Sequence, residues 1–159
     1  AKIVHLAILI IAVGIAGSSL FKTESTVRLS PGQSAGIHNY RLQYGGTQVI
    51  DTVDSRRYIA TMSLSQGQSP IATLYPEKNL HHSIGQYVTE VAIRSTLIDD
   101  VYVALDWPEQ EGQATFRLSI YPLVSWLWAG AALLLAGTLI ALWPSPVEFR
   151  EARDELSVA

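Results

Sequence analysis

Two long apolar stretches lie near the ends of the 159-residue sequence. Residues 3–20 contain no ionisable side chain except His5, and residues 123–143 contain none. At about 1.5 Å per residue, a helix of either length approaches the hydrocarbon thickness of a bilayer. Aromatic residues flank the second stretch as interfacial anchors do, at Tyr121, Trp126, Trp128 and Trp143. We therefore expect two transmembrane helices, at residues 1–22 and 122–143.

A secretory signal peptide is the alternative for the first stretch. The small residues Ala16-Gly17-Ser18-Ser19 would then be its cleavage site. The apolar region of a signal peptide is usually shorter than this one. The second stretch of spanning length also favours a membrane protein over a secreted one.

The segment between the helices alternates apolar and polar residues, as half-buried β-strands do. Its turn signals are Ser30-Pro31-Gly32, Gly45-Gly46, residues 66–70 and residues 108–112. We expect residues 23–121 to form an all-β domain of six to eight antiparallel strands, in a small sandwich or barrel. Its core should include Val101, Val103, Leu105, Phe116, Leu118 and Ile120.

Charges near the two ends suggest an orientation in the membrane. Lys2, Arg150 and Arg153 lie in the terminal flanks, and basic flanks favour the cytoplasmic side. The loop of about a hundred residues is too long for its own charges to decide topology. We expect a multi-pass protein of the cytoplasmic (inner) membrane, with the β domain periplasmic or external. Residues 144–159, after a Pro144-Ser145-Pro146 break, would be a cytoplasmic tail.

Composition excludes several classes of function. The net charge of −3 provides no basic surface for nucleic acid, and the absence of cysteine removes disulfides and thiolate chemistry. The sequence also lacks a phosphate-binding loop, a dinucleotide fingerprint, a nucleophile elbow and a zincin motif. We predict no catalytic residue in this chain.

Four histidines are the candidate metal ligands. His5 is the one ionisable residue within the apolar stretches, where an imidazole usually faces a partner, a cavity or a cofactor. It also lies about one turn from the start of its helix, so an interfacial histidine is an equal alternative. His81 and His82 are adjacent and point to opposite sides of an extended chain. We therefore expect these two and His38 to be solvated loop residues.

Small residues and charges allow two further predictions. Gly14 and Gly17 in the first helix, and Gly130 and Gly137 in the second, have spacings that permit close contact with partner helices. A catalytic set would need a positioned nucleophile, which the charged group Glu90, Arg94, Asp99 and Asp100 lacks. We expect these four to be solvated or paired at the surface.

Four blocks of sequence resemble the carboxy-terminal part of the CcmF/NrfE family, the haem lyase subunits of cytochrome c-type biogenesis. The blocks occur in the order found in the family and cover nearly the whole chain. They are HLAILIIAVGIAGSSLFKTE (5–24), LYPEKNLH (74–81), TEVAIRSTLIDDVYVAL (89–105) and YPLVSWLWAGAALLLAGTLIAL (121–142).

The resemblance implies a role in attaching haem to the CxxCH motif of apocytochrome c. The implied partners are the rest of the lyase, a CcmE-type haem chaperone, a CcmH/CcmI-type subunit, apocytochrome c and membrane lipid. The family also holds a b-type haem (haem b) within the membrane, and His5 occupies the place of one axial ligand. Ala7 or a neighbour stands where the family often has glycine.

Several parts of the family pattern have no match in this sequence. These are the tryptophan-rich WWD segment, its flanking periplasmic histidines and the second transmembrane histidine. We therefore expect either a fragment of a longer lyase or one subunit of a split lyase, and not an enzyme that acts alone. The alternative is a structural accessory subunit of a membrane complex, with the β domain as a periplasmic binding module.

Overall fold

The computed structural model describes residues 2–110 and 112–143, and the predicted tail lies outside them. Within this part, one helix precedes ten strands and a second helix follows them. The elements are α1 (Lys2–Leu20), β1 (Thr23–Leu29), β2 (Ser34–Ile37), β3 (Tyr40–Asp51), β4 (Ser55–Gln66), β5 (Ser69–Leu74), β6 (Glu77–His81), β7 (Gln86–Glu90), β8 (Ala92–Ser95), β9 (Asp99–Gln110), β10 (Gln113–Pro122) and α2 (Val124–Ala141).

The strands form two antiparallel sheets. One sheet has the order β1-β10-β9-β8, and the other has the order β2-β3-β4-β6-β7 with β5 paired to β4. Only Val91 separates β7 from β8, so the chain passes there from one sheet to the other. The predicted antiparallel β domain is confirmed, but the described part has ten strands where six to eight were expected.

The core between the sheets follows the predicted alternation. All six residues predicted for β9 and β10 are at most 3% exposed. They pack against the alternate residues of β3 and β4, including Leu42, Tyr44, Met62 and Leu64. The rings of Tyr44 and Phe116 meet edge to face across the core, with centroids 5.0 Å apart. The two sheets therefore share one hydrophobic core, formed by residues that are far apart in sequence.

The turn predicted at Gly45-Gly46 was wrong. Strand β3 continues through both glycines, and its pairing with β4 shifts by one residue between Tyr44 and Gly46. Gly46 has a φ of 124°, which side-chain-bearing residues rarely adopt. The glycine pair therefore makes a β-bulge inside a twelve-residue strand and does not end it.

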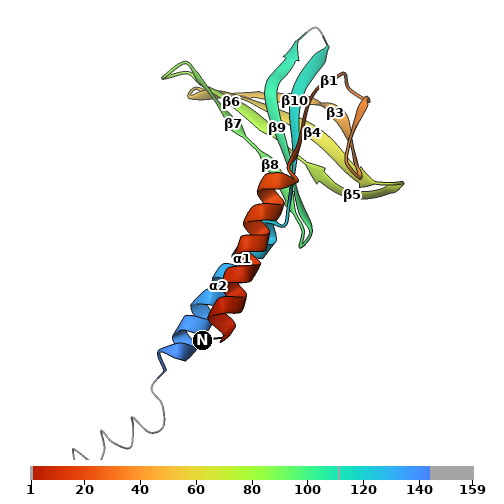
Figure 1. Ribbon diagram of the computed structural model, residues 1–159. Helices are drawn as coiled ribbons and strands as arrows, with labels where there is room; N and C mark the ends of the chain where they lie inside the picture. The colour runs from red at the N-terminus through yellow and green to blue at the C-terminus, as the bar shows by residue number, and fades with distance from the viewer. Residues whose placement is uncertain (1, 111, 144–159) are drawn as a thin grey trace, which may run out of the picture.

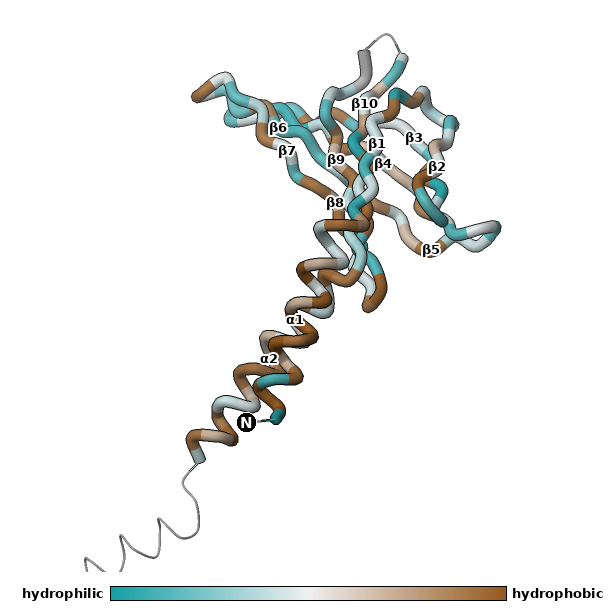
Figure 2. Tube along the Cα trace, viewed as in Figure 1, coloured by the Kyte–Doolittle hydropathy of each residue, from teal (hydrophilic) through white to brown (hydrophobic). Residues whose placement is uncertain are grey.

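The two helices pack side by side and extend away from the sheets (Figure 1). They run antiparallel, since Gly17 of α1 contacts Leu123 and Gly137 of α2 contacts Ile3. Both are long and apolar enough to cross a membrane, and few of their residues are buried. Figure 2 shows hydrophobic residues over most of the helix pair. The helices lie inside the predicted ranges 1–22 and 122–143.

Candidate functional site

His5 lies in the first turns of α1, at the end of the helix pair remote from the β domain (Figure 1). Its side chain is exposed. Buried Ala7, on the face toward α2, follows two residues later, so His5 points about 200° around the helix from that contact. The imidazole therefore faces away from α2.

The four candidate glycines all lie where α1 and α2 touch. Each is buried, and a methyl group built on any of them would meet the opposite helix. At Gly130 that methyl would lie 2.6 Å from Ile11 Cγ1 and 3.1 Å from the Ala7 carbonyl oxygen. The glycines thus allow close approach between the two helices of this chain.

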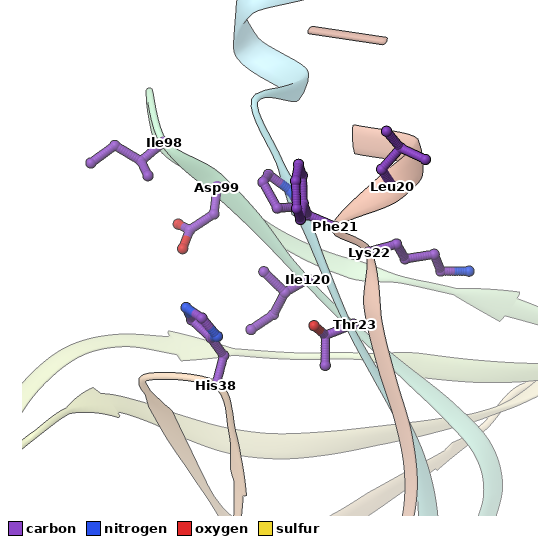
Figure 3. Close-up of a pocket in the computed structure, with 9 residues that line it drawn as sticks. Leu20, Phe21, Lys22, Thr23, His38, Ile98, Asp99 and Ile120 are labelled. Atoms are coloured by element: carbon purple, nitrogen blue, oxygen red, sulfur yellow. The ribbon is translucent and has the colours of Figure 1, made fainter. Parts of the chain in front are cut away.

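A pocket of about 420 Å³ lies where the helices join the sheets. Its walls come from the end of α1, the start of β1, the turn before β3, the start of β9 and the end of β10. The side chains of His38 and Asp99 point into it, whereas Lys22 points away (Figure 3). His38 occupies the β2–β3 turn with a φ of 51°.

Asp99 lines this pocket and also binds a tyrosine of the core. The Tyr40 hydroxyl, 59 residues away in sequence, donates a hydrogen bond of 2.9 Å to Asp99 Oδ1. Burial raises the pKa of Tyr40, and its hydrogen bond to Asp99 raises that pKa further. No local motif signals this pair, because its members come from different sheets.

The other histidines lie apart from His5. His82 Nδ1 is 3.1 Å from the Val53 carbonyl oxygen, at the turn between β3 and β4. His81 ends β6 and is half-buried. Over residues 2–110 and 112–143, no three histidine, aspartate or glutamate side chains gather into a metal site.

The charged group of four does not form one surface cluster. Glu90 is exposed and accepts a 2.7 Å hydrogen bond from Asn79 Nδ2, as a solvated residue can. Asp100, expected at the surface, is only 4% exposed, so that expectation was wrong. Its strand, β9, lies between β8 and β10 in the sheet, and Asp100 pairs with Ser95 of β8 and Tyr121 of β10. Asp100 Oδ1 makes no hydrogen bond.

A known protein-family model matches the β domain. Residues 20–122 match the model described as the CcmF C-terminal beta-sandwich. The chain belongs to this family. The matched range contains all the described strands, whereas His5, Gly14, Gly17, Gly130 and Gly137 lie outside it.

Relatives of the CcmF family extend the similarity into the helices. The cytochrome c-type biogenesis protein CcmF of Escherichia coli is 32% identical over 139 residues, which is 87% of this chain and 22% of that protein. CcmF of Pseudomonas aeruginosa is also 32% identical, over 89% of this chain and 22% of its own length. The chain thus spans about a fifth of the length of the curated relatives it matches.

A solved structure shows the same fold. The chain named cytochrome c heme lyase CcmF superposes with a TM-score of 0.72 and 23% identity. The superposition covers 89% of this chain and 24% of that one. The resemblance to the CcmF family found in the sequence is therefore confirmed by both the family model and the fold.

Proposed function

We propose that the chain is part of a cytochrome c maturation haem lyase, which attaches haem to the CxxCH motif of apocytochrome c. The observation that carries this proposal is the match of residues 20–122 to the CcmF C-terminal beta-sandwich. Its relatives are named cytochrome c-type biogenesis proteins and a heme lyase, which supports the reaction class. In this chain we assign no catalytic residue.

In the proposed arrangement, α1 and α2 cross the cytoplasmic membrane and the β domain stands on its periplasmic side. The length and apolar surface of both helices support the crossing. Their antiparallel packing supports the topology, because it brings the start of α1 and the end of α2 to the same side (Figure 1). The sheets then lie wholly on the other side.

We assign to His5 one axial position of a membrane b-type haem. An unprotonated imidazole nitrogen is a suitable iron ligand. The ring is exposed on the face of α1 opposite α2, where a helix of the rest of the lyase can reach it. Helix α2 contains no histidine, methionine or cysteine, so the second ligand belongs to a helix outside this pair. Bound haem supplies a redox-active iron.

The proposed partners are those of the maturation system. They are the remainder of the CcmF-type lyase, a CcmE-type haem chaperone, a CcmH/CcmI-type subunit and apocytochrome c. The β domain would meet the water-soluble parts of these proteins, since it stands outside the membrane in this arrangement. The helix pair would meet the rest of the lyase through the face that carries His5.

A haem spectrum of the assembled complex tests the proposal. The tagged chain is purified from native membranes, and oxidised and dithionite-reduced spectra are compared for wild type, His5→Ala and His82→Ala. We expect the b-haem absorption to be lost or altered in the first variant only. His82 is the matched control, because it is a second imidazole that lies in the β domain. Identical spectra and haem-to-protein ratios in all three would refute the role of His5.

Co-purifying proteins test the wider function. Cytochrome c maturation components in the same preparation are the expected result. A respiratory or transport complex in their place would instead identify an accessory subunit. Either result can be read even when the spectrum of His5→Ala is unchanged, so the ligand and the function are tested separately.

A further inference from the structure

The turn between β8 and β9 exposes two large apolar side chains. Leu97 is 78% exposed and Ile98 is 73% exposed. The turn lies on the side of the domain from which the helices emerge, beside the start of α2 (Figures 1 and 2). Adjacent exposed apolar side chains of this size usually mark a contact surface.

The carbonyl groups of residues 96–98 all accept hydrogen bonds from Leu123, just before α2, or from the first turn of α2. The Leu123 N–H donates to the Ile98 oxygen at 2.8 Å. Ser125 Oγ donates to the Thr96 oxygen at 2.5 Å, and Trp126 Nε1 donates to the Leu97 oxygen at 3.0 Å. Three consecutive carbonyl oxygens therefore have partners within the protein.

The N–H groups of Thr96, Ile98 and Asp99 are also bound locally. Thr96 Oγ1 accepts hydrogen bonds from the N–H groups of Ile98 and Asp99, at 3.2 and 3.0 Å. The Thr96 N–H donates to the Asp99 oxygen at 2.9 Å. The charged Asp99 side chain points into the pocket and accepts from Tyr40, away from the exposed tip.

This pattern suits an environment without water. A surface turn normally leaves carbonyl groups to solvent, but hydrocarbon offers no partner and each unsatisfied group costs several kcal/mol. Here the exposed parts are mainly apolar side chains. Other large apolar residues near the same ends of the helices are also exposed, namely Leu20, Phe21, Trp126 and Trp128. Tryptophan is enriched at the interface between hydrocarbon and headgroups.

We propose that the Leu97-Ile98 turn inserts into the lipid of the periplasmic leaflet, at the boundary between acyl chains and headgroups. This inference rests on the proposed crossing of the membrane by α1 and α2. The turn adds a point of attachment beside the helix pair. Because the hydrogen bonds to α2 fix the turn, this attachment sets the tilt of the β domain relative to the membrane.

Single cysteines provide the test, since the sequence contains no natural cysteine to remove. The full chain is reconstituted in phosphatidylcholine vesicles with an environment-sensitive NBD label at Leu97→Cys. Two variants are matched controls: Val53→Cys in the β3–β4 turn, which is 92% exposed, and Leu135→Cys on α2, which is 65% exposed. Each is measured with and without lipids that carry a doxyl quencher near the headgroup.

We expect the label at position 97 to have a blue-shifted emission and to be quenched by doxyl lipid, as at position 135. The label at position 53 should show neither effect. A label at position 97 that behaves like the one at position 53, while position 135 is quenched, overturns the inserted turn alone. A blue shift at position 97 without quenching by lipid also overturns it, because protein then covers the turn. Absence of quenching at position 135 overturns the membrane crossing itself.

Ile98→Cys repeats the measurement at a second position. Its side chain is also exposed, so the substitution removes little packing. Quenching at both positions is expected of an inserted tip. Quenching at neither, in vesicles where position 135 is quenched, contradicts the proposal independently of any local effect at Leu97.

Discussion

Gly130 should tolerate alanine worse than Gly17, although both lie in the same helix contact. A methyl group at Gly130 meets Ile11 Cγ1 at 2.6 Å and backbone atoms of α1 at 3.1 Å. The Cγ1 atom of a β-branched side chain has little rotational freedom in a helix, and backbone atoms move only with the whole helix. A methyl group at Gly17 also meets an atom at 2.6 Å, but this is Cδ1 of Leu123, the far end of a flexible side chain.

The expected magnitudes follow from two opposing effects. Replacing glycine by alanine inside a helix is favourable by about 1 kcal/mol when nothing obstructs the methyl group. Overpacking of a tight contact costs roughly 1–3 kcal/mol. Gly130→Ala should therefore weaken the helix pair by about 1 kcal/mol net, since its obstruction cannot rotate away. Gly17→Ala should be near neutral, because Leu123 Cδ1 can move away by a change of rotamer and only the milder contact with Leu123 Cβ, at 3.2 Å, is fixed.

Spin labels on the two helices can measure this difference. Leu9→Cys and Leu135→Cys are exposed positions on α1 and α2, and every variant carries the same labelled pair. The short-distance population is followed in mixed micelles as the fraction of SDS rises. We expect a lower SDS midpoint for Gly130→Ala and a nearly unchanged one for Gly17→Ala. Ala131→Leu is the control for added volume on an exposed face of α2. The reverse order of the two glycine variants would refute the steric reasoning.

Four substitutions in the β domain test its packing and charges, and each is measured by thermal unfolding of the purified chain. Phe116→Ala should destabilise it by about 3–5 kcal/mol, because the ring is fully buried; a loss below about 1 kcal/mol would mean the core repacks. Glu90→Gln should cost well under about 1 kcal/mol, and Asp100→Asn should leave the Tm unchanged or raise it, since it removes a buried carboxylate with an unpaired oxygen. A clear loss for Asp100→Asn would indicate a bound partner for that oxygen. Tyr40→Phe should lower the free energy of unfolding by about 2 kcal/mol at pH 7, because the hydrogen bond to Asp99 is lost. The raised folded pKa of Tyr40 stabilises the fold below pH 10, and this contribution is lost as the pH rises through the folded pKa, so the difference from wild type should shrink there.

The long strands and both helices could be predicted because each has a periodic pattern. Strands β9 and β10 have one face in the core, so their apolar residues recur at every second position. The short strands had no such pattern. In β7 (Gln86–Glu90), four of the five residues are exposed, and an edge strand with both faces in water need not alternate. This is why the strand number was underestimated.

Contacts across the fold could not be read from the sequence. The Tyr40–Asp99 hydrogen bond joins two sheets, and nothing local to either residue indicates it. Asp100 was misplaced for a related reason. An acidic pair before a strand usually belongs to a solvated turn, but here β8 and β10 both extend alongside Asp100. Burial at that position depends on neighbouring strands that local periodicity does not reveal.

The glycines and His5 lie on different faces of α1. The face with Gly14 and Gly17 is occupied by α2, which accounts for small residues in both helices without a further protein. His5 lies on the opposite face of α1, and its side chain is exposed. If α1 crosses the membrane as proposed, an imidazole on it is costly unless it has a partner there. The proposed haem ligation therefore requires another helix on the His5 face, and it does not compete with the packing of α1 against α2.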